Sequence, residues 1–403
     1  MSERVITPRN RGFLFLDSHP AGCARLVNDM WHAVAARPAA ALDDDAPVAL
    51  IIGSSSGYGL AATVAGLARA GIRGIGVSFE KAPTERRTGT AGWYRTAATA
   101  ELAQDAGREM HFLNGDAFSD EMKEQVADLV KRRFGRLDHL IYSVAAPRRT
   151  DPETGTTFSS SLKPIGATAR TKTLVFDEDG KPDVREVSTE PADEGEIAQT
   201  IAVMGGIDWA RWVSHLADRG LLADGFSTAA LSYIGSPLTA DIYREGTIGA
   251  AKAHLEQTAR ELDARLRDLC GGRAVTSVNG AAVTQSSTAI PGIALYTGLL
   301  RGVLGDRMVS PVDQLAELWD QLTGVQPLVT DDEGRVRLDT WELAPEVQEA
   351  VAERWQTATT ETITDLADLE WFRDSVRQLY GFSAPGIDYP APVETEVPWP
   401  AGR

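Results

Sequence analysis

The chain contains few of the residues that build disulfide or metal sites. Its 403 residues include two cysteines, Cys23 and Cys270, and six histidines. Two cysteines are too few for a disulfide framework or a cysteine-based zinc site, and the histidines show no metal-ligand spacing. We therefore predict that the chain has no metal site.

The chain also lacks an excess of positive charge and any long apolar segment. It carries 40 lysines and arginines against 57 aspartates and glutamates, a formal net charge of −17. Nucleic acids and anionic membranes attract basic surfaces, so neither is an expected partner. The N-terminal MSERVITPRNRGF has no apolar signal-peptide core, and no apolar run approaches the length of a bilayer span. We therefore expect a cytoplasmic enzyme.

Short apolar runs and helical patterns alternate along much of the chain. The expected strands are at 48–52, 75–79, 110–113, 139–143, 228–234 and 274–278. Strand–helix alternation at this spacing predicts right-handed βαβ units. The predicted fold class is therefore α/β, with a mostly parallel twisted sheet and helices on both faces.

We interpret 1–403 as one domain with two additions. The segment 147–226 is polar and rich in turns, and we interpret it as an insertion with a hairpin over 171–187 that turns at Asp179-Gly180. From 286 to 403 the pattern is mainly helical. Within that part, DDEGRVRL at 331–338 suggests a second hairpin that turns at Gly334.

A glycine-rich loop follows the first expected strand and precedes a helix. Its residues are Gly53, Ser54, Ser55, Ser56, Gly57, Tyr58 and Gly59. Glycines at such a place permit a tight turn and a close approach to a pyrophosphate, and the helix N-terminus offers backbone N–H groups. The loop therefore predicts a dinucleotide site, and its G-x3-G-x-G spacing is typical of short-chain reductases.

Phe79 and Glu80 end the second expected strand. An acidic side chain there can hydrogen-bond the ribose hydroxyls of NADH and repel the 2′-phosphate of NADPH. Lys81 follows and could accommodate that phosphate. NADH is therefore the favoured cofactor and NADPH the open alternative.

The ends of the third and fourth expected strands extend the predicted cofactor site. Asp116 and Ala117 follow the third strand, where such folds place an adenine contact. Small residues after the fourth strand would let the nicotinamide ribose pass; they are Ser143, Val144 and Ala145.

Tyr243 and Lys252 are the candidates for the chemistry. In one straight helix they would lie on opposite faces, because nine residues turn about 900°. Gly246 and Gly249 allow Tyr243 to lie on a loop and Lys252 in the first turns of a helix, so that the two converge. A phenol suits the oxygen where negative charge develops during hydride transfer, and a nearby ammonium lowers the phenol pKa. The alternative is a core tyrosine and a solvated lysine.

The spacing Tyr-x8-Lys within YIGSPLTADIYREGTIGAAKAHLE resembles the FabV class of enoyl-ACP reductases and the similar trans-2-enoyl-CoA reductases. The likeness runs almost end to end. It includes PRNRGF, HPAGC, IGSSSGYGLA, TAGWY, YSVAAPRRTDPETG, LKPIG, VMGGIDW, VTQSSTAIP, DDEGRVRLDTWE and LYGF.

The resemblance implies a monomer with an enlarged Rossmann fold that uses NADH to reduce the C2=C3 bond of a trans-2-enoyl thioester of CoA or acyl carrier protein. Tyr243 would be the acid and oxyanion donor, Lys252 would hold the cofactor ribose and tune Tyr243, and Tyr233 would line the site beside the substrate. The C-terminal part, 286–403, would cover the substrate site. The resemblance also implies cofactor contacts from Tyr58, Val283, Thr284 and Gln285.

The sequence departs from the family at two lysines. The family usually has lysine where this chain has Gly280, and a second lysine commonly stands at the position of Ala253. These departures bear on the substrate, and the lost lysine allows a protein without activity. Two alternatives to enoyl reduction therefore stay open. One is a carbonyl (3-oxoacyl) reductase that uses the same pair, and the other is a catalytically silent NADH-binding protein.

Overall fold

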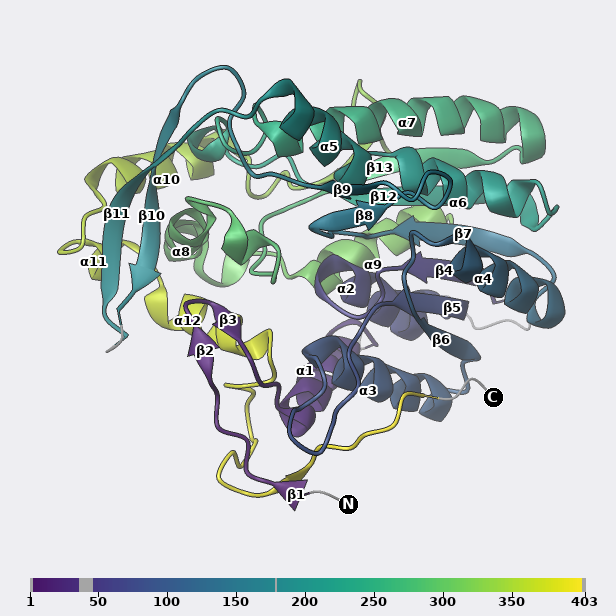
Figure 1. The fold of residues 1–403 in the computed structure, drawn as a ribbon, viewed down its shortest axis with the longest axis horizontal. Helices are drawn as coiled ribbons and strands as arrows, with labels where there is room; N and C mark the ends of the chain where they lie inside the picture. Colours follow the sequence, from purple (N-terminus) through teal and green to yellow (C-terminus); the bar gives the residue numbers. More distant parts are fainter. Residues whose placement is uncertain (1–2, 36–45, 178–179, 401–403) are drawn as a thin grey trace.

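The computed structural model describes residues 3–35, 46–177 and 180–400. Its centre is a seven-stranded sheet in the order β14-β13-β12-β7-β4-β5-β6 (Figure 1), and each pair of neighbouring strands is parallel. This confirms the predicted α/β class. The strands are β4 (Val48–Ile52), β5 (Arg73–Ser78), β6 (Met110–Asn114), β7 (Leu137–Tyr142), β12 (Leu222–Ser232), β13 (Arg273–Asn279) and β14 (Arg335–Leu338).

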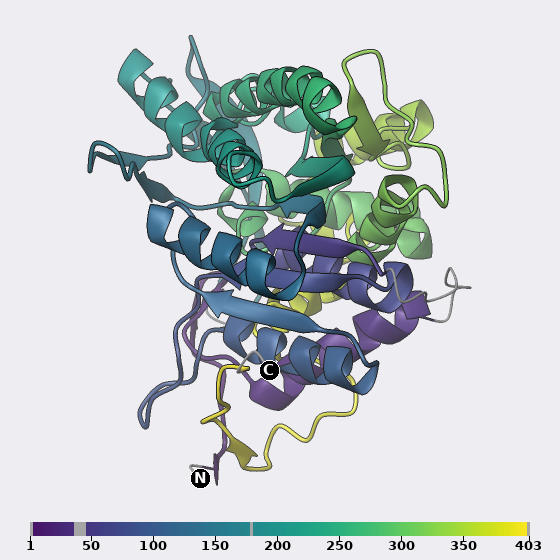
Figure 2. The ribbon, with the colours of Figure 1, turned by 90° about the vertical axis from the view of Figure 1, so that its right-hand side faces the viewer.

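Helices cover both faces of the sheet (Figure 2). Successive strand residues point to opposite faces, so Leu50 and Ile51 enter different apolar clusters. Ile51 packs with α1 (Pro20–Ala35), α2 (Gly57–Ala65), a π turn (Gly66–Ala70) and α9 (Pro311–Leu322). Leu50 packs with α4 (Asp120–Arg133), α6 (Ile207–Ala217) and α7 (Thr247–Cys270). Helix α3 (Ala91–Asp105) lies against α1.

The segment between β7 and β12 carries a long hairpin. Its strands β10 (Ala169–Phe176) and β11 (Pro182–Thr189) are antiparallel, which confirms the hairpin predicted over 171–187. Of the two predicted turn residues, Gly180 has a positive φ, and Asp179 lies outside the described residues. In Figure 1 the hairpin stands at one end of the molecule, beside α8 and α10. The same segment contains β8 (Arg148–Thr150), β9 (Thr157–Ser159) and α5 (Glu194–Met204).

The C-terminal helices form a third apolar cluster together with Leu174 of the hairpin. They are α8 (Ile293–Leu304), α10 (Pro345–Thr357), α11 (Ile363–Leu366) and α12 (Leu369–Gln378). The remaining short elements are β1 (Glu3–Arg4), β2 (Asn10–Arg11), β3 (Leu14–Phe15), β15 (Val393–Glu394) and the 3-10 turns Pro237–Thr239, Ser287–Ala289 and Gly305–Arg307. Strand β1 pairs with β15, so the first and last described strands lie side by side (Figure 1).

The second predicted hairpin, over 331–338, is wrong. Gly334 does lie in a turn with positive φ, but the described residues just before it, 323–333, form no strand, and the strand after it joins the main sheet as β14, parallel to β13. Val336 and Leu338 are buried there. Burial of these two apolar side chains against the sheet is a gain that an exposed local hairpin would not provide.

The described residues contain neither a candidate membrane span nor a candidate metal cluster. No helix there is long and apolar enough to cross a bilayer. No group of three or more histidine, cysteine, aspartate or glutamate side chains in the same ranges could hold a metal ion.

A buried ion pair joins the layers on the face that carries α4 and α6. Lys123 Nζ lies 2.8 Å from Asp208 Oδ1, with both side chains buried, and it also donates to the carbonyl oxygens of Ala117 and Phe118. The hydroxyl of Tyr142 donates to the other oxygen of Asp208 at 3.0 Å. The pair therefore connects α4, α6, β7 and the loop after β6.

We expect Lys123→Met to lower the free energy of unfolding by about 3–5 kcal/mol, because it leaves the Asp208 carboxylate buried without its cation. Urea denaturation measures the loss. The matched control is Arg25→Ala, which breaks the exposed Arg25–Asp29 pair and should cost less than about 1 kcal/mol. Equal losses in the two variants would contradict a structural role for the buried pair.

Candidate active site

The predicted site residues all follow carboxyl ends of strands in the central sheet. Because the strands are parallel, these ends share one edge, and open α/β sheets bind ligands at that edge. The residues are Gly53, Ser54, Ser55, Ser56, Gly57, Tyr58 and Gly59 after β4; Phe79 and Glu80 after β5; Asp116 and Ala117 after β6; Ser143, Val144 and Ala145 after β7; Tyr233, Tyr243 and Lys252 after β12; and Val283, Thr284 and Gln285 after β13.

At two positions of the glycine-rich segment after β4, no residue larger than glycine fits. A Cβ on Gly53 would lie 2.0 Å from the carbonyl oxygen of Ser143, and a Cβ on Gly59 would lie 2.0 Å from the carbonyl oxygen of Gly53. A Cβ on Gly57 would lie 3.7 Å from Thr284 Cγ2, so the loop after β13 borders the same space. A tight loop that opens into a helix N-terminus fits the pyrophosphate of a dinucleotide.

Glu80 is held beside this loop by three side chains. Its carboxylate accepts hydrogen bonds from Ser55 Oγ at 2.6 Å and from the hydroxyl of Thr90. Asn114 binds the Glu80 backbone on both sides, accepting from its N–H at 2.7 Å and donating to its carbonyl at 3.0 Å. Phe79, just before it, has an exposed fraction of 77%. A fixed carboxylate at this point suits a ribose diol and repels a 2′-phosphate.

Tyr243 lies in a turn just before α7, and Lys252 lies in the second turn of that helix. The N–H of Gly249 donates to the carbonyl oxygen of Tyr243 at 2.9 Å. A Cβ on Gly249 would lie 1.7 Å from the carbonyl oxygen of Arg244, so only glycine lets the turn fold back against the helix. This is the loop-and-helix path that the glycines predicted.

The three residues predicted for the chemistry gather at the end of β12. Lys252 Nζ donates to the carbonyl oxygen of Leu231 at 3.4 Å. The rings of Tyr233 and Tyr243 meet edge to face, with centroids 5.1 Å apart. The structure therefore brings Tyr233, Tyr243 and Lys252 to one strand end, and their roles stay predictions.

The expected lowering of the Tyr243 pKa is wrong for this structure. Burial raises the pKa of Tyr243, the negative charge of Glu342 raises it further, and the charge of Arg244 opposes both. Burial lowers the pKa of Lys252 to about 8, with Glu256 acting in the opposite direction. Tyr243 therefore stays protonated at neutral pH as a hydrogen-bond donor.

Glu342, which was not among the predicted site residues, contacts these tyrosines from the turn after β14. Its side chain has no exposed surface, and its Oε1 accepts hydrogen bonds from the hydroxyls of Tyr233 and Tyr296, both at 2.7 Å. Its Oε2 accepts from the N–H of Ala281 at 2.5 Å. Burial raises the pKa of Glu342 to about 7, against the lowering effect of these hydrogen bonds. A carboxylate after a strand end is a recognisable signal, but β14 was predicted as half of a hairpin.

The two departures from the family differ in their surroundings. A Cβ on Gly280 would lie 2.3 Å from Cζ2 of Trp341, so that ring fills the space where a longer side chain would begin. The Gly280 backbone is held by Gln314, which accepts its N–H at 2.8 Å, and by the hydroxyl of Tyr58, which donates to its carbonyl oxygen. Ala253, in contrast, is exposed on α7. A lysine at position 280 would require Trp341 to move.

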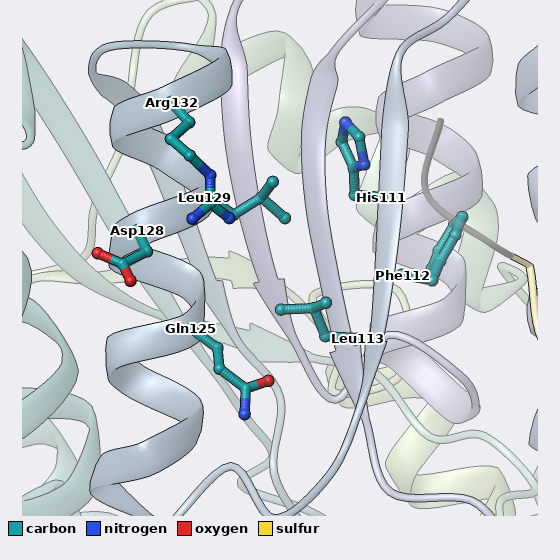
Figure 3. A pocket seen from close by; sticks show the side chains of 7 residues that line it. All are labelled: His111, Phe112, Leu113, Gln125, Asp128, Leu129 and Arg132. Atoms are coloured by element: carbon teal, nitrogen blue, oxygen red, sulfur yellow. The ribbon is translucent and has the colours of Figure 1, made fainter.

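A pocket lies on the edge strand β6, against α4 (Figure 3), and shares no residue with the predicted site. Its side chains mix apolar and charged groups. They are His111, Phe112 and Leu113 of β6, and Gln125, Asp128, Leu129 and Arg132 of α4.

Comparison with known proteins assigns the chain to a family. Residues 87–323 match the family model described as the trans-2-enoyl-CoA reductase catalytic region, and residues 5–85 match the NAD(P)H binding domain of trans-2-enoyl-CoA reductase. The chain belongs to the trans-2-enoyl-CoA reductase family. The enoyl-[acyl-carrier-protein] reductase [NADH] of Streptomyces avermitilis is 58% identical over 395 residues, which cover 98% of this chain and 99% of that protein.

Solved structures of this family have the same fold. The Treponema denticola trans-2-enoyl-CoA reductase in complex with NAD is 38% identical, with a TM-score of 0.89 over 97% of this chain and 98% of that one. The Clostridium acetobutulicum trans-2-enoyl-CoA reductase in complex with NADH is 34% identical, with a TM-score of 0.91 over 98% of both chains. With the matched binding domain, these relatives support NADH as the cofactor.

A third family model, described as an enoyl reductase FAD binding domain, matches residues 330–393. The described residues of this segment do not form a second dinucleotide cradle. Strand β14 leads into a turn at Asp339 with no glycine loop, and the apolar residues of α10 and α12 are packed into the third cluster. We assign no flavin chemistry to this segment.

We expect Gly249→Ala to destabilise the chain by about 3 kcal/mol, because its Cβ would overlap the Arg244 carbonyl and push the Tyr243 turn off α7. Thermal unfolding measures the effect. The matched control is Gly298→Ala within α8, whose Cβ would meet Ala367 Cβ at an ordinary 3.5 Å and should gain about 0.5–1 kcal/mol. If both variants kept the wild-type stability, the turn would not depend on glycine at 249.

We expect Glu342→Gln to remove part of the pH dependence of stability. The Glu342 pKa is raised from an ordinary 4.5 to about 7, so the folded chain binds more protons than the unfolded chain between these values. The free energy of unfolding therefore falls as pH rises through this window, by about 3 kcal/mol for this group. Urea denaturation of the wild type and the variant at pH 5 and pH 8 measures the difference. Parallel losses in the two proteins would show that Glu342 is not neutral in the fold at low pH.

Proposed function

We propose that the chain reduces the C2=C3 double bond of a trans-2-enoyl thioester with NADH and releases the saturated acyl thioester. The observation that carries the proposal is the grouping of Tyr233, Tyr243 and Lys252 at the end of β12, on the sheet edge that bears the glycine loop. Membership of the trans-2-enoyl-CoA reductase family supports the same reaction.

Tyr243 is proposed as the acid. NADH, when bound, supplies a hydride to C3 of the substrate. Tyr243 donates a hydrogen bond to the thioester oxygen, where the negative charge of the enolate develops, and its raised pKa keeps its own proton on the phenol. The enolate then takes up one proton at C2, which gives the saturated acyl thioester. Lys252 holds the cofactor ribose, and Tyr233 lines the site beside the substrate.

The cofactor contacts are proposed from the glycine loop and the neighbouring strand ends. The loop Gly53–Gly59 would receive the pyrophosphate, with Thr284 on its other side. Val283 and Gln285, the neighbours of Thr284, are proposed cofactor contacts from the family resemblance. Glu80 would bind the adenine ribose and favour NADH, as the name of the Streptomyces avermitilis relative also indicates for that enzyme. Asp116 and Ala117 would lie at the adenine, and Ser143, Val144 and Ala145 at the nicotinamide ribose.

The carrier, the assembly and the location are further parts of the proposal. The relatives are named for thioesters of acyl carrier protein or of CoA, and we propose that this chain accepts an enoyl thioester of one of the two. We also propose a monomer, as the family resemblance implies, and a cytoplasmic location, as expected from the sequence. Oxidation of NADH and of NADPH across a chain-length series of enoyl-CoA esters tests cofactor and substrate together.

We expect Tyr243→Phe to bind NADH as the wild type does but to lose about 100-fold in kcat with crotonyl-CoA, because one preorganised donor to an oxyanion contributes about 3 kcal/mol. Absorbance at the NADH band measures turnover, and fluorescence titration measures NADH binding. The matched control is Tyr94→Phe, a buried phenol of α3 bonded to the Thr395 carbonyl, which should keep its activity.

The same assays separate the alternatives. A carbonyl reductase would oxidise NADH with a 3-oxoacyl thioester and not with crotonyl-CoA. A silent NADH-binding protein would bind NADH and turn over neither substrate. Unchanged enoyl-CoA reduction by Tyr243→Phe would exclude Tyr243 as the acid.

A further inference from the structure

The two oxygens of the Glu342 carboxylate have different partners. Oε1 accepts hydrogen bonds from the hydroxyls of Tyr233 and Tyr296, each at 2.7 Å. Oε2 accepts from the N–H of Ala281 at 2.5 Å. An ionised carboxylate can only accept, so in that form both phenol protons point at Oε1 and away from anything else.

When Glu342 is protonated, the hydrogen bonds at one of its two oxygens must change. Oε2 accepts from the N–H of Ala281, and a carbonyl oxygen accepts a hydrogen bond better than an acid hydroxyl does, so the added proton is favoured on Oε1, where it faces the two phenols. One phenol must then accept from Glu342 and turn its own proton elsewhere. Protonation at this carboxyl therefore changes the direction of a tyrosine hydroxyl.

Tyr233 is the phenol that can turn. Tyr296 is fully buried and is held from a second side by Gln348, whose Nε2 donates to its oxygen at 3.0 Å. Gln348 is itself fixed by a hydrogen bond to the Glu342 carbonyl at 2.9 Å and by one from Ser236 at 2.6 Å. Within the described residues, the Tyr233 hydroxyl hydrogen-bonds to Glu342 alone.

Tyr233 is also the phenol next to the proposed acid, Tyr243. Its ring meets the ring of Tyr243 edge to face, with centroids 5.1 Å apart. A Tyr233 proton that leaves Oε1 can therefore reach the neighbourhood of the oxygen that Tyr243 binds. That oxygen carries the developing negative charge, so a second donor there lowers the barrier.

We propose that Glu342 is a positioning residue for the proposed enoyl reduction, because its protonation decides whether the Tyr233 hydroxyl donates to the carboxylate or toward the enolate oxygen at Tyr243. The inference rests on the proposed function. It also connects the C-terminal part of the chain to the acid through Tyr233, since Glu342 follows β14 and Tyr296 lies in α8.

Glu342 changes its protonation near neutral pH, and this pH depends on the charged and titratable groups around it. Tyr233, Tyr243, Tyr296 and Tyr58 face it from other elements, and Asp339 faces it from the same turn. Asp339 is paired with Arg337 at 2.8 Å. Burial holds the pKa of Glu342 at about 7. Glu342 is therefore neutral below that pH and ionised above it, so the rate of the reduction should fall as pH rises through 7.

The test is the pH profile of hydride transfer in single turnovers with NADH and crotonyl-CoA, both saturating. We expect the wild type to lose about tenfold in rate between pH 6 and pH 8.5, as expected for loss of one hydrogen bond to a charged group. Glu342→Gln copies the neutral carboxyl, with its carbonyl oxygen toward Ala281 and its NH2 toward the phenols. We expect this variant to lose the step near pH 7 and to exceed the wild-type rate severalfold at pH 8.5.

Two further variants form a matched pair, because each removes one of the two phenols from Oε1. Loss of either hydrogen bond raises the pKa of Glu342, since both bonds lower it. Tyr296→Phe should therefore keep the pH step and move it to higher pH. Tyr233→Phe should abolish the step, because the hydroxyl that responds to Glu342 is gone. The Lys252 pKa of about 8 lies in the same pH range. Because Lys252 is proposed to bind the cofactor ribose, its titration is measured separately, as the pH dependence of the KM for NADH.

The outcomes separate this inference from the proposed function. If the wild type reduces no enoyl thioester, the proposed function fails. If the wild type is active and Glu342→Gln keeps the same pH step, or if Tyr233→Phe keeps it as Tyr296→Phe does, the role of Glu342 is overturned. Thermal unfolding of each variant identifies one that has not folded, and the remaining variants still decide the question.

Discussion

The parallel arrangement of seven strands is the constraint on which the rest of this structure depends. Parallel neighbours place every carboxyl end at the same edge, so loops that are far apart in sequence meet there. The close approach of Gly53 to the carbonyl of Ser143 shows how tightly two such loops fit. The glycine loop, Glu80 and the tyrosine–lysine pair therefore belong to one site, because each follows the carboxyl end of a strand in the same parallel sheet.

Burial of polar groups is the second physical theme. A carboxyl, two phenols and a backbone N–H lie together behind Tyr243, and each is expensive to bury unless it is hydrogen-bonded. Glu342 satisfies all of them with two oxygens. The same burial raises the pKa of Glu342 to about 7, so the carboxyl gains or loses its proton near neutral pH. The network thus connects the C-terminal helices to the sheet, and through Tyr233 it also contacts the proposed acid, Tyr243.

The sequence predicted the fold class and the main strands because each strand is a short apolar run bounded by turn residues. It also predicted that Tyr243 and Lys252 would lie on a loop and a helix, since Gly246 and Gly249 break the straight path. It failed at 331–338, where Gly334 suggested a local hairpin. There the burial of Val336 and Leu338 against β13 decided the outcome.

By itself the sequence determined the α/β class, the glycine loop, the acidic residue after β5 and the family resemblance, because these depend on local patterns and ordered motifs. Only the tertiary structure decided that Glu342 meets Tyr233, 109 positions earlier in the chain. It also decided that Trp341 fills the space at Gly280 and that burial raises the Tyr243 pKa. Each of these depends on which distant side chains pack around a group, and no local pattern of residues contains that information.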